Sequence, residues 1–98
     1  MILKQIVSEL ETSTHPVAKA LHKGSGFKVL AIGFKQGMIL KEHQAHLPTH
    51  LFVLSGKVVY KQGELSKTIS TQEQTEIPIE ETHSVEALED SMCLLIQG

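Results

Sequence analysis

The feature that most constrains the fold is a series of short β-type segments that begins after Gly26 and recurs at intervals of about ten residues. Turn-forming residues separate them, and the segments are FKVLAIGF, MILKEH, HLFVLS, KVVYKQ, ELSKTISTQ, TEIPIEE, HSVEAL and SMCLLIQ. This spacing predicts an all-β sandwich or barrel rather than alternating βαβ units. Short strands with one buried face need closure into a barrel, or a partner chain, to cover their edges.

The first 26 residues do not show this pattern clearly. Within ETSTHPVAKALHKGSG, Pro16 near a first turn and Gly24 as a stop favour a helix. The alternating apolar residues of the same stretch favour a short strand, so both interpretations stand. With 98 residues in total, we expect one domain, in which residues 27–98 form the barrel and residues 1–26 form an edge strand or a dimer arm.

Composition excludes several classes of protein. The chain is 41% hydrophobic and 20% charged with a formal net charge of −2, which predicts a globular domain without nucleic-acid partners. No apolar run is long enough for a membrane span. The single cysteine, Cys93, excludes an internal disulfide and favours a reducing, cytoplasmic location. Its apolar neighbours predict a buried small hydrophobe rather than a nucleophile.

Histidines are concentrated in one short part of the sequence. Three of the six lie within eight positions, at His43, His46 and His50, and His83 follows a proline-containing turn. Imidazole is the commonest ligand for zinc, iron and similar metals. Ligands on one regular strand must be an even number of residues apart, which His43 and His46 are not. If Pro48 interrupts the strand, these side chains can converge on one metal.

The same residues resemble the two sequence motifs of the cupins, small double-stranded β-helix (jelly-roll) barrels. Gly37 is followed by five residues and then by His43, and Gly56 closes the first motif after a Val-Leu-Ser sequence typical of the family. Pro78, four intervening residues and His83 match the centre of the second motif.

The chain also departs from both motifs. Ala45 stands at the second histidine of the first motif, and Thr49 stands at its glutamate. Gln72 and Glu80 replace two glycines of the second motif, and Ala87 replaces its asparagine. The chain therefore resembles the small single-domain bacterial cupins in which the set of metal ligands is thinned.

The resemblance covers roughly residues 28–96 and implies an all-β cupin-type jelly-roll barrel, with a strand rather than a helix over residues 17–22. It implies a divalent metal (zinc, iron, nickel or manganese) held by His43 and His83. His46 and His50 match no ligand position of the motifs, but a local rearrangement of the strand would let them serve as substitute ligands. Alternation along the strands predicts that a small-molecule pocket is lined by Met38, Thr49, Leu51, Val53 and Val85.

Three functions are compatible with these features. The first is a homodimeric cupin that binds a metal and a small organic ligand, with an unknown reaction if it is an enzyme. The second is a metal-free module that binds or senses a small molecule, which the losses at Ala45 and Thr49 favour. The third is a structural dimerisation unit with a filled barrel.

Overall fold

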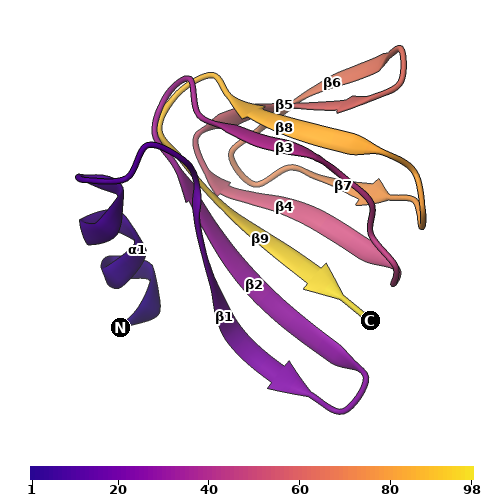
Figure 1. The fold of residues 1–98 in the computed structure, drawn as a ribbon, viewed down its shortest axis with the longest axis horizontal. Coiled ribbons are helices and arrows are strands. Elements are labelled where there is room, and N and C mark those ends of the chain that lie inside the picture. The colour runs from indigo at the N-terminus through magenta and orange to yellow at the C-terminus, as the bar shows by residue number, and fades with distance from the viewer.

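The computed structural model describes all 98 residues as one helix followed by nine strands (Figure 1). The elements are α1 (Ile2–Leu10), β1 (Val17–Gly24), β2 (Phe27–Phe34), β3 (Ile39–His43), β4 (Thr49–Ser55), β5 (Lys57–Gln62), β6 (Leu65–Ser70), β7 (Gln74–Ile77), β8 (His83–Ala87) and β9 (Ser91–Gln97).

The strands form two antiparallel sheets, which lie opposite one another in Figure 1. One sheet has the order β1-β2-β9-β4-β7 and the other has the order β3-β8-β5-β6. Neighbours that are distant in sequence, such as β9 between β2 and β4, give the crossovers expected of a jelly roll. The prediction of an all-β, cupin-type jelly-roll barrel is confirmed.

The core lies between the two sheets and consists mainly of aliphatic residues. Alternation is clear in β4, where Thr49, Leu51 and Val53 are buried, and in β8, where His83 and Val85 are buried. The buried apolar residues of this core are Ile32, Phe34, Ala45, Leu51, Val53, Val58, Tyr60, Ile69, Ile77, Val85, Ala87, Cys93 and Leu95. The predicted cysteine environment agrees: burial raises the pKa of the Cys93 thiol to about 12, so it is no nucleophile at neutral pH.

The N-terminal helix was not predicted. Its apolar residues recur every three or four positions, and Ile6 and Leu10 are buried on the outer face of the five-stranded sheet against Ala31. Gly33 of β2 makes this contact possible, because a Cβ there would lie 2.4 Å from Ile6 Cγ2 and 2.9 Å from Leu10 Cδ1. Figure 1 shows α1 packed outside the barrel beside β1 and β2. No helix of the structure is long and apolar enough to span a bilayer.

The segment for which the sequence allows either a helix or a strand is a strand. β1 pairs with β2 along Val17–Gly24 and forms one edge of the five-stranded sheet, with an irregularity between Ala20 and His22. Pro16 lies immediately before this strand, where its missing N–H costs no ladder hydrogen bond.

Gln72 and Glu80 take the place of the two motif glycines at a conformational cost. Their φ angles are +67° and +62°, in the left-handed region that glycine adopts freely. Both are held there by backbone hydrogen bonds, from Gln72 N to Val53 O and from Glu80 N to Ala45 O. We expect Gln72→Gly and Glu80→Gly each to raise the free energy of unfolding by up to about 1 kcal/mol.

Urea denaturation of the two glycine variants measures this effect. Gln74→Gly, within the regular strand β7, is the control and should lower the stability instead. A loss of stability in Gln72→Gly and Glu80→Gly as large as that of the control would contradict the assignment of strain to these positions.

Candidate functional site

His43 and His83 lie side by side at the end of the four-stranded sheet. They are direct partners in the β3–β8 ladder, and their ring centroids are 4.2 Å apart with an angle of 58° between the planes. Leu40 and His43 are an odd number of residues apart, so on a regular strand they would face opposite ways. A register shift between them lets Leu40 pair with Val85 and His43 pair with His83, both of which face inwards from β8. Tyr60 of β5 stacks on the His83 ring at 5.7 Å, so the pair is backed by an aromatic side chain.

Each imidazole is oriented by a backbone carbonyl. His43 Nδ1 lies 2.8 Å from Lys41 O, and His83 Nδ1 lies 3.0 Å from Glu81 O. Because a carbonyl oxygen only accepts hydrogen bonds, each neutral ring carries its proton on Nδ1 and leaves Nε2 with a free lone pair. His83 is only 2% exposed, and its Nε2 has no hydrogen-bond partner in the chain. Every fully buried side-chain nitrogen or oxygen does have a partner, so Nε2 is not fully buried and keeps some contact with solvent.

Burial and charge alter two ionisable groups of this cluster. Burial lowers the pKa of His83 below its ordinary value of 6.5; the carbonyl of Glu81 opposes this shift and the charge of His43 adds to it. Burial, and then the charge of Glu81, raises the pKa of Tyr60. Its hydroxyl lies 2.8 Å from Gln62 Oε1, to which it donates a hydrogen bond. At neutral pH the cluster therefore holds a neutral imidazole and a neutral phenol.

The lowered pKa of His83 makes stability depend on pH. Below pH 6.5 the unfolded chain binds a proton at His83 that the folded chain binds only at a lower pH. Stability is therefore fully present above the unfolded pKa and falls as the pH drops from about 6.5 towards the folded pKa. We expect the melting temperature to fall between pH 7.5 and pH 5.5, and this fall to be smaller in His83→Gln.

The matched control for this measurement is His46→Gln, which changes an exposed histidine. Thermal unfolding followed by circular dichroism at several pH values should give the parent and the control the same slope. A His83→Gln variant with an unchanged pH dependence would show that another group is responsible.

The structure brings together only two of the four predicted metal ligands. His50 points to the outer face of the five-stranded sheet, where its Nε2 lies 3.9 Å from Glu76 Oε1. His46 is exposed in the segment between β3 and β4. Thr49 Oγ1 donates its hydrogen bond to Leu47 O at 2.8 Å, and Ala45 offers no ligand atom.

The donor set therefore does not fit the metal that the resemblance implies. No three His, Cys, Asp or Glu side chains lie close enough together to hold a metal ion. Zinc, iron, nickel and manganese sites in proteins ordinarily need three or more protein ligands.

The residues predicted to line a pocket belong to the core. Leu51, Val53 and Val85 are members of the buried cluster, Thr49 is buried beside them, and Met38 is half-buried against it. The cavity next to His43 lies instead outside β3. Its volume is about 510 Å³, and its lining residues are His15, Pro16, Ile39, Leu40, Lys41, Glu42 and His43.

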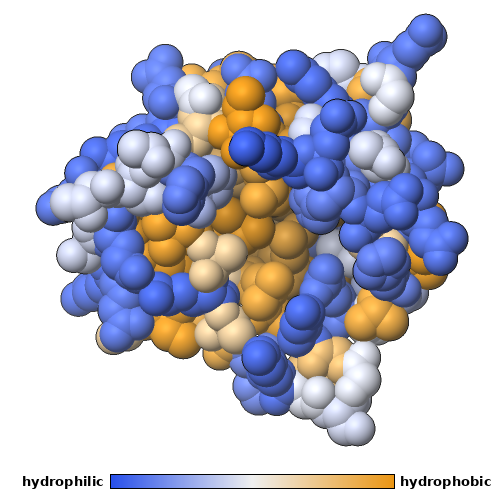
Figure 2. Space-filling model, in the orientation of Figure 1, coloured by the Kyte–Doolittle hydropathy of each residue, from blue (hydrophilic) through white to orange (hydrophobic).

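Sequence reasoning missed two polar members of this cavity, His15 and Lys41, which line it together with Glu42. His15 belongs to the loop before β1, and no local pattern in the sequence places that loop beside β3. Ile39 and Leu40 add apolar surface, so the cavity combines apolar walls with a few polar groups, as small-molecule sites do. Exposed apolar side chains also occur outside this cavity. Figure 2 shows a hollowed apolar band across the centre of the molecule, with hydrophilic side chains on both sides of it.

Comparison with known proteins supports the fold. No protein-family model matches the chain, and no curated protein sequence matches it. Among solved structures, a cupin superfamily protein from Desulfitobacterium hafniense superposes with a TM-score of 0.80 at 15% identity, covering 87% of this chain and 78% of that one. An RmlC-like cupin from Desulfovibrio desulfuricans superposes with a TM-score of 0.76 at 24% identity, covering 84% and 80%.

A third solved structure, KdgF from Halomonas sp., superposes with a TM-score of 0.76 at 17% identity and covers 87% of this chain and 81% of its own. These likenesses establish the fold: the chain has the jelly-roll fold of small cupins, as its motifs predicted. The identities are too low to transfer an activity, so the function has to be inferred from this chain's own residues.

Proposed function

We propose that the chain is a metal-free binding module that holds a small hydroxycarboxylic acid in the cavity beside His43 without transforming it. The observation that carries the proposal is the position of His43, which lines a cavity of about 510 Å³ and whose ring is oriented by the Lys41 carbonyl through Nδ1, so that Nε2 is left for a ligand.

The cavity supplies groups for each part of such a ligand. Lys41 makes no ion pair within the chain, so its ammonium group is free for a carboxylate. The His43 Nε2 lone pair is free to accept from a ligand hydroxyl group. Ile39, which is 50% exposed, and Leu40 offer an apolar wall for the body of the ligand.

A metal is left out of this proposal because two imidazoles are not a complete ligand set. Catalysis is left out because no carboxylate is hydrogen-bonded or ion-paired to His43 or His83. Glu42 lines the same cavity as His43, but it is exposed.

We also infer a homodimer, which would cover the β1 edge of the five-stranded sheet. β1 has a hydrogen-bonding partner on one side only, and Leu21 and Phe27 nearby are exposed. The lone buried thiol supports a reducing, cytoplasmic location. Size-exclusion chromatography with light scattering tests the dimer, and a monomer at micromolar concentration would contradict it.

Isothermal titration calorimetry with three related probes tests the proposed ligand class. Mandelate carries a carboxylate, a hydroxyl group and an apolar ring, phenylacetate lacks the hydroxyl group, and benzyl alcohol lacks the carboxylate. We expect mandelate to bind most tightly, and Lys41→Ala and His43→Ala each to weaken it by about two- to tenfold. Lys4→Ala, on the exposed side of α1, is the control and should leave binding unchanged. Equal affinities for the three probes, or no binding of mandelate, would overturn the proposal.

A further inference from the structure

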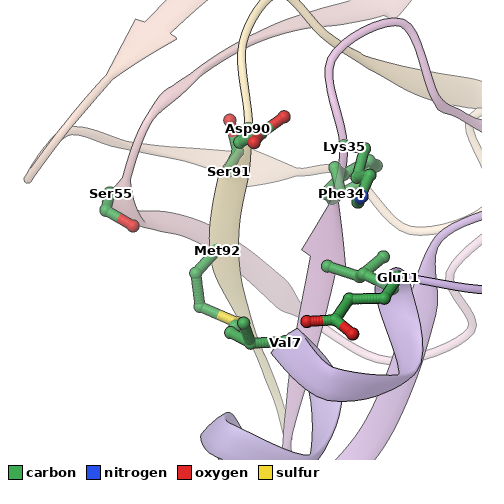
Figure 3. Close-up of a pocket in the computed structure, with 9 residues that line it drawn as sticks. Val7, Glu11, Phe34, Lys35, Ser55, Asp90, Ser91 and Met92 are labelled. Carbon is green, nitrogen blue, oxygen red and sulfur yellow. The ribbon is translucent and has the colours of Figure 1, made fainter.

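A second cavity lies at the opposite end of β8 from His83, between α1 and the turn that joins β8 to β9. Its volume is about 320 Å³, within the range of small-molecule pockets. Figure 3 shows the side chains that surround it, which are Val7, Leu10, Glu11, Phe34, Lys35, Ser55, Asp90, Ser91 and Met92.

The floor of this cavity is apolar. Leu10 and Phe34 are buried, Met92 is half-buried, and Val7 is 56% exposed although it belongs to the docked helix. An aliphatic side chain placed on this floor would cover apolar surface that the chain leaves open to water.

The rim carries charges of both signs that have no ion-pair partner in the chain. Glu11, Asp90 and Lys35 are absent from all three ion pairs of the structure. Asp90 is held in place, because its Oδ1 accepts a hydrogen bond from the Gln36 N–H at 2.8 Å, and its other oxygen stays free. In Figure 3 the Glu11 carboxylate and the Ser55 hydroxyl group point towards the middle of the cavity.

The helix adds to the preference for a positive group at one end. The cavity adjoins the C-terminal end of α1, and the last turn of this helix contains no basic residue. The carbonyl groups at a helix C-terminus carry partial negative charge, which a ligand ammonium group would compensate.

We propose that this cavity binds a free amino acid with a branched aliphatic side chain. Its ammonium group meets the acidic side chains of the rim, Glu11 and Asp90, its carboxylate meets Lys35, and its side chain covers Val7 and Met92. The charges of the rim complement such a zwitterion better than they complement a simple anion or cation. This site is separate from the cavity beside His43 and stands whether or not that proposal holds.

Methyl NMR of protein labelled at its methionines, with L-leucine as the probe, tests the site directly. Met92 reports on the cavity floor, and Met1, which does not line the cavity, serves as an internal reference. We expect L-leucine to shift the Met92 signal saturably at millimolar concentration. Isocaproate, which lacks the ammonium group, and isoamylamine, which lacks the carboxylate, should each bind about two- to fivefold more weakly or not at all.

Two surface variants separate specific binding from a general effect. Glu11→Gln and Lys35→Ala change exposed side chains, so both should fold as the parent does, and each should weaken leucine binding by about two- to fivefold. Glu64→Gln, in the turn between β5 and β6, is the control and should leave binding unchanged. A Met92 signal that leucine does not shift, or variants that bind as tightly as the control, would overturn the proposal.

Discussion

Replacing Gly56 with alanine is expected to lower the free energy of unfolding by about 2–5 kcal/mol. Gly56 has a φ of +102°, and a Cβ added to it would lie 2.2 Å from Ser91 Oγ and 2.5 Å from the backbone oxygen of Asp90. Ser91 cannot move away freely, because its Oγ accepts from Lys57 N at 3.0 Å and donates to a backbone carbonyl. The substitution therefore disrupts the junction of β4, β5 and β9.

Gly63→Ala is the matched control for this prediction. Gly63 also has a positive φ, of +57°, but apart from its own neighbours in the chain no residue lies within 4 Å of the position that a Cβ would take there. Only the conformational cost remains, so we expect a loss of about 1 kcal/mol. Urea denaturation of both variants gives the difference. Equal losses would show that the close approach to Ser91 contributes nothing.

Replacing Ile6 with alanine should lower the free energy of unfolding by about 2–4 kcal/mol. Ile6 is fully buried between α1 and the outer face of the five-stranded sheet, where it approaches Gly33. Removing it leaves a cavity under the helix and reduces the apolar area that holds the helix on the sheet.

Val7→Ala, one position along the same helix, is the control and should change the stability by no more than about 0.5 kcal/mol, because Val7 is exposed. Thermal unfolding and amide exchange of α1 measure the two effects. If Ile6→Ala proves as mild as Val7→Ala, the helix does not dock on the barrel as the structure shows.

The barrel could be predicted because its signals are local. Most strands from β2 to β9 contain their own apolar residues, and turn residues such as Gly37, Gly56 and Gly63 separate several of these strands. The helix was missed because its short apolar pattern, Ile2 to Leu10, gains stability from burial against Gly33, a contact that the sequence pattern does not reveal.

The site could be predicted only in part, for a reason of the same kind. His43 and His83 match motif positions, and the ladder between β3 and β8 places them together. The position of His50 follows from strict alternation along β4, which directs it outwards. His15 and Lys41 line the same cavity because the loop before β1 lies beside β3. The pattern of apolar residues in the sequence does not predict this contact between the loop and the strand.

The most direct test of the proposed function is the imidazole NMR spectrum of protein dialysed against EDTA and titrated with mandelate. Metal-free binding predicts saturable shifts of the His43 and His83 signals, unchanged when zinc is added afterwards and absent in His43→Ala. If the signals shift only after one equivalent of zinc has bound at the two histidines, the chain is a metal-dependent protein and the proposal of metal-free binding is wrong.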